Sequence, residues 1–255
     1  MQKLLPALAN KIESSSADTR FIALKVFTDY VTQFMCEEKI YQPQENSHTT
    51  QLLNELILKK FLANYGLIVT DQEPMPLYGL KLLSVILERN AAFVMILKKL
   101  SLTQVLLEYF SVGHAKFNAF TVKIVRAMVA SREIPIEELL EHDIVTKLNK
   151  IMQDVVTKNQ EWASDHLLII MNEILHLVAE QKKNDPESKV PQQVFNKLLV
   201  NFKYFSKLLT ASDIVSLNST NCCFSQSWRA LRLICSPSFT LACCKESKKT
   251  TLTCV

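Results

Sequence analysis

The sequence predicts an all-α protein: a right-handed α-solenoid of armadillo- or HEAT-like helical repeats over residues 1–212, followed by an irregular cysteine-rich tail over residues 213–255. Three observations lead to this fold class. The 255 residues include only three glycines, so the positive-φ residues of tight hairpins are scarce. Amphipathic stretches recur at long intervals, and their apolar periodicity fades after about residue 212. A hydrophobic content of 48% supplies enough apolar surface for a packed core.

Three stretches repeat the same order of residue types. ALKVFTDYV from Ala23, GLKLLSVIL from Gly79 and TVKIVRAMV from Thr121 each run small residue, aliphatic residue, lysine and then two apolar residues. The starts lie 56 and 42 residues apart, and a weaker match near Leu168 follows about 47 residues later. Such spacings, with two or three helices per unit, are typical of HEAT and armadillo arrays, whose repeats bury their apolar faces only by stacking. An irregular helical bundle remains the alternative.

The first unit is predicted to contain two antiparallel helices. LLPALANKI forms a short helix with Pro6 in its first turn, where a missing N–H costs nothing. Three serines then end it, and Ser16 or Asp18 can cap the second helix. The apolar face of that helix follows the i, i+3, i+4, i+7 rule and consists of Ala23, Leu24, Phe27, Tyr30, Val31 and Phe34.

An acidic and a basic residue open the second helix. Asp18 and Arg20 stand where HEAT units commonly carry an Asp and an Arg. This pair predicts a ladder of charge-assisted hydrogen bonds between repeats.

The second unit begins with TTQLLNELILKKFLANYG, which predicts a helix ending near Gly66. Pro74 and Pro76 begin the next helix, in which Leu80 and Leu83 are expected in the core. Further helices are expected at about 92–100, 102–112, 136–158 with a break at His142 and Asp143, 160–182 and 191–210.

The charge distribution argues against nucleic acid as a partner. The net charge is +4, but residues 220–255 contain five Lys/Arg and one acidic residue, so residues 1–219 contain 24 charges of each sign. Phosphate binding requires a concentrated basic face with aromatic platforms, and this neutral body shows neither. No apolar run reaches the length of a membrane span, because LLIIMNEILHLVA is interrupted by Asn172, Glu173 and His176. We expect a cytoplasmic protein without a secretory signal.

The cysteines mark a change of composition near the C-terminus. Six of the seven lie in the last 34 residues: Cys222, Cys223, Cys235, Cys243, Cys244 and Cys254. Their spacing contains no C-x-x-C knuckle and the tail has no histidine, so a zinc site is disfavoured. We predict neither a metal nor a cofactor.

No catalytic constellation meets its geometric requirements. One candidate is the adjacent trio Glu141, His142 and Asp143, whose side chains would point in different directions on a helix and so cannot form a triad. We interpret this trio as a polar junction between helices. Glu173 and His176 form one E-x-x-H pair, and a di-iron site needs a second pair and two more acids. The protein is therefore predicted not to be an enzyme.

Candidate protein-binding residues come from three places. Trp162 is the second residue of EWASDH and His166 is the last, where nuclear-import armadillo proteins place a Trp and Asn pair. The asparagine is absent, so an import receptor is not predicted and a groove-lining role remains. Arg126 lies in the third repeated stretch. Thr253 and Val255 fit a C-terminal PDZ ligand, an ending that chance also produces.

Packing motifs over roughly residues 1–220 resemble the C-terminal helical-repeat region of the Fused-like unc-51-like kinase family. They are EPMPLYGLKLLSVILERN, LTQVLLEYFSVGHAKFNAFTVKIVRAMV and EELLEHDIVTKLNKIM. The resemblance implies armadillo or HEAT repeats that follow a kinase or pseudokinase domain, and an association with microtubules, cilia and Hedgehog-type signalling. A Gly-rich loop, H-R-D and D-F-G are missing, so no phosphotransfer is predicted.

Together these patterns predict a non-catalytic protein–protein interaction scaffold in a ciliary or microtubule-associated assembly. The alternative is a regulatory module acting in trans on a serine/threonine kinase or pseudokinase domain. The expected partners are proteins, and an uncapped repeat end would favour self-association.

Overall fold

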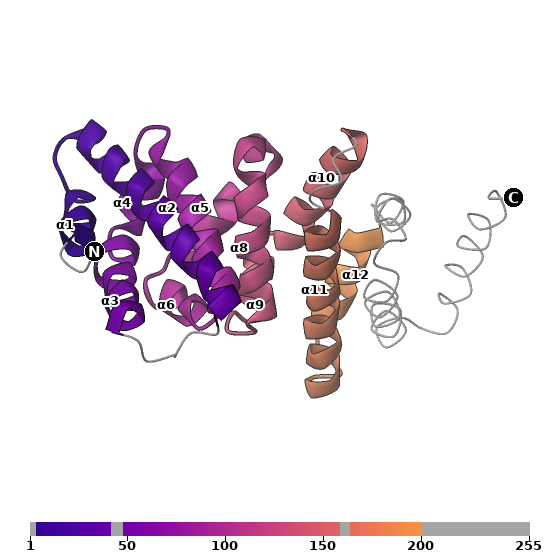
Figure 1. Ribbon diagram of the computed structural model, residues 1–255. Helices are drawn as coiled ribbons and strands as arrows, with labels where there is room; N and C mark the ends of the chain where they lie inside the picture. The colour runs from indigo at the N-terminus through magenta and orange to yellow at the C-terminus, as the bar shows by residue number, and fades with distance from the viewer. Residues whose placement is uncertain (1–3, 42–47, 159–163, 200–255) are drawn as a thin grey trace, which may run out of the picture. The chain divides into compact units, whose positions relative to one another are not determined.

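The computed structural model describes residues 4–41, 48–158 and 164–199 (Figure 1). Every regular element in these ranges is a helix, and none of them contains a strand. The predicted fold class, an all-α solenoid of HEAT-like repeats, is confirmed. The chain divides into two compact units, Met1–Glu133 and Ile134–Val255.

The helices follow the predicted order. In the first unit they are α1 (Leu4–Lys11), α2 (Ala17–Tyr41), α3 (His48–Leu56), a π-helical segment (Ile57–Leu62), α4 (Tyr65–Thr70), α5 (Met75–Arg89), α6 (Phe93–Lys99), α7 (Thr103–Tyr109), a 3₁₀ segment (Val112–Phe117) and α8 (Asn118–Ala130). In the second unit they are α9 (Ile136–Glu141), α10 (Ile144–Thr157), α11 (Ser164–Asn184) and α12 (Val190–Leu199). The predicted break at His142 and Asp143 separates α9 from α10. The tail predicted over residues 213–255 lies outside the described residues.

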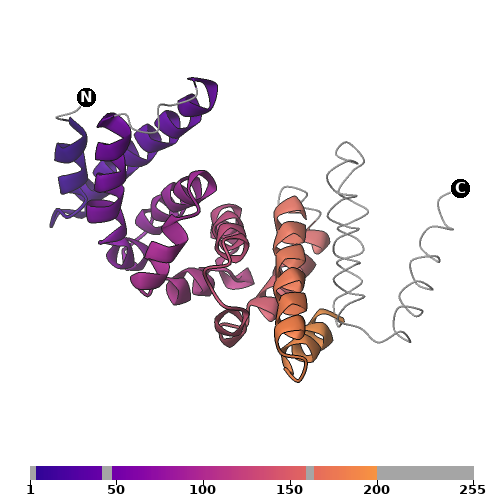
Figure 2. The ribbon, with the colours of Figure 1, turned by 90° about the horizontal axis from the view of Figure 1, so that it is seen from below.

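The three repeated stretches form α2, α5 and α8, which are stacked side by side. In the first unit α5 packs against α2 and against α8, and Figure 2 shows these helices succeeding one another in chain order. Equivalent apolar positions of the stretches are buried together. Leu24, Leu80 and Val122 share one position and Phe27, Leu83 and Val125 another, and all six are fully buried. Burial of Leu80 and Leu83 confirms their predicted place in the core.

Each repeated stretch begins with a small residue. In α5 this residue is Gly79, and close packing requires it to be small. A Cβ atom at Gly79 would lie 2.6 Å from Ile68 Cγ2 of α4, closer than two carbon atoms can approach. The corresponding residues, Ala23 and Thr121, are buried as well. Gly79 therefore lets α4 and α5 approach each other within the second repeat.

The helix that was predicted to end near Gly66 ends slightly earlier, and Gly66 is not the residue that ends it. Gly66 lies inside α4, and the break occurs earlier, at Asn64, whose backbone leaves the helical region at φ −102° and ψ 8°. The Asn64 amide donates to the Lys60 carbonyl at 2.8 Å and to Glu13 Oε1 at 3.0 Å. This side chain replaces helical hydrogen bonds at the turn, which is the role that asparagine commonly has in loops.

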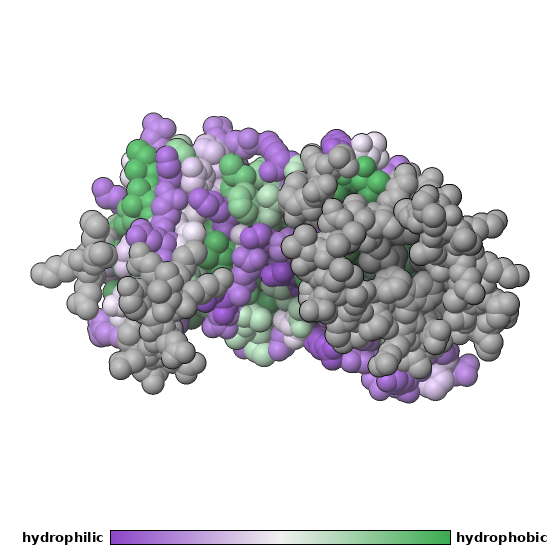
Figure 3. Space-filling view, turned by 45° about the vertical axis from the view of Figure 1, so that its right-hand side comes forward, coloured by the Kyte–Doolittle hydropathy of each residue, from purple (hydrophilic) through white to green (hydrophobic). Residues whose placement is uncertain are grey.

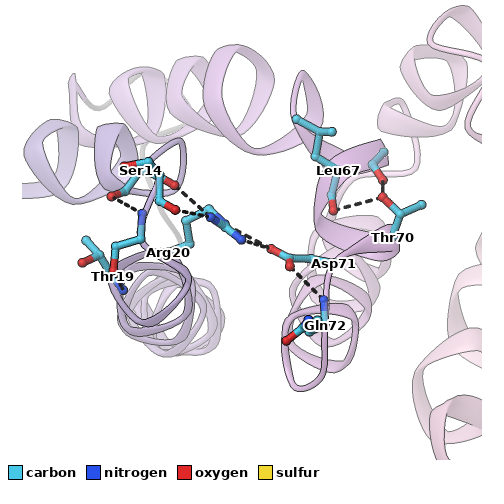
Figure 4. Close-up of polar contacts among 10 residues, drawn as sticks. Ser14, Thr19, Arg20, Leu67, Thr70, Asp71 and Gln72 are labelled. Atoms are coloured by element: carbon cyan, nitrogen blue, oxygen red, sulfur yellow. Dashed lines mark hydrogen bonds and ion pairs between the residues drawn. The ribbon is translucent and has the colours of Figure 1, made fainter.

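The predicted Asp18 and Arg20 ladder takes a different form, with Asp71 as the acid. Arg20 Nε and Nη2 donate to Asp71 Oδ2 at 3.0 and 2.7 Å, and Nη1 donates to the carbonyls of Ser14 and Ser15 at 3.0 and 3.1 Å (Figure 4). Asp18 is exposed, and Ser16 Oγ accepts from the Thr19 N–H as the helix cap. Arg20 thus ties the α1–α2 turn to the end of α4.

Leu83→Ala should lower the free energy of unfolding by about 2 to 5 kcal/mol, because it leaves a cavity in the stacked core. Leu67→Ala, at a side chain that is 71% exposed, is the matched control and should cost less than about 0.5 kcal/mol. Chemical denaturation followed by circular dichroism measures both. Equal costs for the two variants would contradict the packing of α5.

The Arg20 pair should make stability depend on acid pH. Hydrogen bonds from Arg20 lower the pKa of the Asp71 carboxyl. Because the unfolded state then binds the proton more tightly, this stabilisation is present above the ordinary carboxyl pKa of about 4 and is lost as the pH falls through the lower folded value. Between pH 5 and about pH 2.5 the wild-type chain should lose more stability than Asp71→Asn does. Parallel losses in urea titrations of both proteins would refute this role.

Candidate protein-binding face

The most distinctive surface of the first unit runs across α2, α5 and α8. We call it the repeat face and define it by seven side chains: Phe21 and Asp29 of α2, Tyr78, Lys81 and Glu88 of α5, and Lys123 and Arg126 of α8. The five that are not acidic are half-buried, and Asp29 is exposed. Because their helices are equivalent elements of successive repeats, the stacking itself aligns these side chains.

Between α2 and α5 the repeat face combines aromatic and charged contacts. The rings of Phe21 and Tyr78 meet edge to face with centroids 5.4 Å apart. Lys81 Nζ lies 5.7 Å from the Tyr78 ring centroid and donates to Asp29 Oδ1 at 3.4 Å. Lys81 therefore contacts the Tyr78 ring of its own helix and the Asp29 carboxylate of α2, the equivalent helix of the preceding repeat.

Between α5 and α8 the contact is a branched ion pair. Glu88 accepts hydrogen bonds from Lys123 Nζ and Arg126 Nη2, each at 3.4 Å. The three side chains are 28 to 35% exposed, so water competes for the same groups. Long, solvated ion pairs of this kind contribute little to stability, and their groups can exchange partners at low cost.

A hollow of about 580 Å³ lies elsewhere in the unit, around the Arg20 and Asp71 pair. Its wall includes Glu13, Asn64 and Leu67. The guanidinium donates to Asp71 and to two carbonyls, and Glu13 accepts from Lys60 and Asn64. Since these charged groups already bind one another, the hollow is explained by the connection between α1, α2 and α4.

The structure includes one of the predicted binding residues in the repeat face. Arg126 pairs there with Glu88. His166 is half-buried on α11 in the second unit. Trp162, Thr253 and Val255 lie outside the described residues, so their predicted roles remain predictions.

The two sequence clusters that contain a histidine lie at helix positions without metal-binding partners among the described residues. Glu141, His142 and Asp143 form the junction of α9 and α10, where Asp143 has φ 54° and accepts from Thr146 Oγ1 at 2.7 Å and from Lys197 Nζ at 2.6 Å. Glu173 and His176 lie half-buried on α11. Across the described residues no three His, Cys, Asp or Glu side chains are grouped to hold a metal ion. Nor does that part of the chain contain a helix long and apolar enough to cross a membrane.

Six of the seven residues of the repeat face were not predicted from the sequence: Phe21, Asp29, Tyr78, Lys81, Glu88 and Lys123. The signal for the two lysines was present, because Lys25, Lys81 and Lys123 occupy the same position of the three repeated stretches. No such signal exists for the acids. Asp29 stands four residues after its lysine, whereas Glu88 stands seven residues after Lys81.

Comparison with known proteins agrees with the helical-repeat architecture. Residues 1–95 match the family model for the HEAT repeats of serine/threonine-protein kinases of the ULK4-like type. The chain is 24% identical over 162 residues to the serine/threonine-protein kinase ULK4 of Mus musculus, an alignment that covers 62% of this chain and 12% of the mouse protein. It is 23% identical over 162 residues to the serine/threonine-protein kinase RUNKEL of Arabidopsis thaliana, covering 63% and 12%.

The chain is thus similar to a small part of two much longer proteins. No solved structure matches it. The repeats in residues 1–95 span α1 to the beginning of α6 and include the Phe21, Asp29, Tyr78, Lys81 and Glu88 side chains of the repeat face.

Glu88→Gln should cost less than about 1 kcal/mol of stability, because the ion pairs it weakens are solvated and long. The helical circular dichroism signal at 25 °C should stay unchanged. A loss above about 2 kcal/mol in urea denaturation would show that Glu88 is a packing residue and unsuitable for binding tests. Glu55→Gln, at an exposed i, i+4 pair with Lys59, is the matched control.

Proposed function

We propose that this chain is a non-catalytic scaffold that binds a partner protein along the repeat face. One observation carries the proposal: three equivalent helices together present, on one surface, an aromatic pair between α2 and α5 and weakly held ion pairs between α2 and α5 and between α5 and α8. Aromatic side chains and arginine anchor interfaces disproportionately. A partner can replace the carboxylates of Asp29 and Glu88 with its own acidic groups, or engage these carboxylates directly, at little cost to the fold.

The family resemblance supports a finer proposal. We infer that the chain corresponds to part of the helical-repeat region of the fourth unc-51-like kinase, and that its partners belong to a ciliary or microtubule-associated assembly. The matches to the HEAT repeats of ULK4-like kinases and to two kinases of this kind support the correspondence to a repeat region. The ciliary or microtubule-associated assembly is proposed from the family resemblance alone.

A second function is favoured by the names of the relatives. Both matched proteins are serine/threonine kinases, and the aligned region covers only 12% of each. A repeat region that accompanies a kinase can regulate it, so the second candidate is a module that binds a kinase or pseudokinase domain in trans. It would use the same repeat face.

Proximity labelling in ciliated cells tests the function. The full chain, fused to a biotin ligase, is compared with the double variant Tyr78→Ala/Glu88→Lys and with the control Glu55→Lys, which reverses an exposed charge on α3. We expect axonemal or microtubule proteins that are recovered by the wild type and the control and lost, by at least about tenfold, with the double variant.

Other outcomes separate the proposals. Recovery of a kinase or pseudokinase that depends on Tyr78 and Glu88 would favour the regulatory module. Partners retained by the double variant would show that the repeat face is not the binding surface. Recovery of chaperones alone would contradict both functions.

A further inference from the structure

Two neighbouring helices of the first unit carry the same pair of side chains on their surface. Tyr78 and Lys81 of α5 occupy the positions that Phe120 and Lys123 occupy in α8. In each pair the aromatic residue precedes the lysine by three positions, so the two side chains lie on one side of their helix. All four residues are half-buried, and each lysine side chain is 35% exposed. An aromatic ring and an ammonium group therefore recur one repeat apart.

Both lysines keep hydrogen-bonding capacity for a further carboxylate. Lys81 Nζ donates to Asp29 and Lys123 Nζ donates to Glu88, each at 3.4 Å. An ammonium group has three donors, and within the described part of the chain these are the only hydrogen bonds that the two lysines donate. The two carboxylates thus hold the ammonium groups in place and leave donors that face water. With Arg126, the repeat face has three basic and two acidic side chains, which favours an acidic partner.

The spacing of α5 and α8 indicates the backbone conformation of that partner. The two helices pack directly against each other, and packed helices lie about 8–10 Å apart. In a polyproline II helix, side chains at i and i+3 point the same way at a separation of about 9.3 Å. A β-strand repeats its side-chain direction at about 6.6 Å and fits this spacing less well. One turn of a polyproline II helix therefore matches one repeat of the solenoid. Figure 3 shows, for the face it presents, that hydrophobic residues reach the surface beside hydrophilic ones.

We propose that Tyr78 with Lys81, and Phe120 with Lys123, bind an acidic, proline-rich segment of a partner protein. The segment lies across α5 and α8 in the polyproline II conformation. Acidic side chains three residues apart accept hydrogen bonds from the two lysines. The prolines between them pack on the aromatic rings, because aromatic grooves recognise this preformed conformation at low entropic cost. The inference rests on the scaffold function and specifies the chemistry of its partner.

Two synthetic peptides of equal composition test the spacing. The first contains four Glu-Pro-Pro triplets, which place one glutamate on the same side of a polyproline II helix in every turn. The clustered control has its four glutamates together between two runs of proline. Binding of each fluorescent peptide to the full 255-residue chain is followed by fluorescence anisotropy at low and at physiological salt.

The triplet peptide should bind saturably and about tenfold more tightly than the clustered control, with lower affinity at physiological salt because the lysines are solvated. Lys81→Glu and Lys123→Glu should each weaken this binding by about tenfold or more. Phe120→Leu keeps an apolar side chain without the ring and should weaken it by about two- to tenfold. Lys99→Glu, at an exposed lysine of α6, is the matched control and should have no effect. A peptide of Lys-Pro-Pro triplets should bind the Lys81→Glu/Lys123→Glu variant better than the wild type, which also reports that this variant is folded.

Three outcomes would overturn the inference. Equal binding of the triplet and clustered peptides would show that the spacing of the acids has no role. Binding that is insensitive to Lys81→Glu and Lys123→Glu would place the peptide elsewhere, and absence of binding at millimolar peptide would exclude this class of ligand. If the peptide fails in one of these ways while partner labelling is still lost with Tyr78→Ala/Glu88→Lys, the scaffold function stands and only the chemistry of its partner is refuted.

Discussion

The structure depends on the fact that one pair of amphipathic helices cannot cover its own apolar stripe. In α5 the residues Leu80, Leu82 and Leu83 are all fully buried, which requires neighbours on several sides of one helix. These neighbours are α4, which directly precedes α5 in the same repeat, and α2 and α8 of the two adjacent repeats. Stacking therefore creates the core, and it also aligns the surface residues of equivalent helices into a continuous face.

Much of this fold could be predicted because its signals are local. Apolar periodicity, a run of serines and two prolines identify α1, α2 and α5, and the break between α9 and α10 follows from a short polar segment. Two features could not be predicted in the same way. The turn at Asn64 depends on Glu13, 51 residues away, and Arg20 selects Asp71 at the same separation instead of the nearby Asp18. Tertiary packing determines which of these side chains lie close together, and apolar periodicity along the sequence does not predict such partners.

The candidate site was predictable only in part. A lysine at a fixed place in each repeat signals a shared role, and Arg126 was identified from the same stretch. The acids that receive these cations occupy different positions relative to their lysines, because long flexible side chains can reach partners on either of two helical turns. The side-chain pairing of a solenoid surface is therefore less regular than its core, where volume and burial restrict each position.

The bridge made by Arg20 affects how the first helices move. A helical array can fray one repeat at a time, since each repeat contacts only its neighbours. One guanidinium holds both the α1–α2 turn and the residue that follows α4, so separation of the α1–α2 hairpin from the next repeat must break charge-assisted hydrogen bonds along with apolar contacts. We therefore expect the two repeats to open as one cooperative block, with amides that exchange with solvent together. That coupling keeps α2 in place as a rigid platform for whatever binds along it.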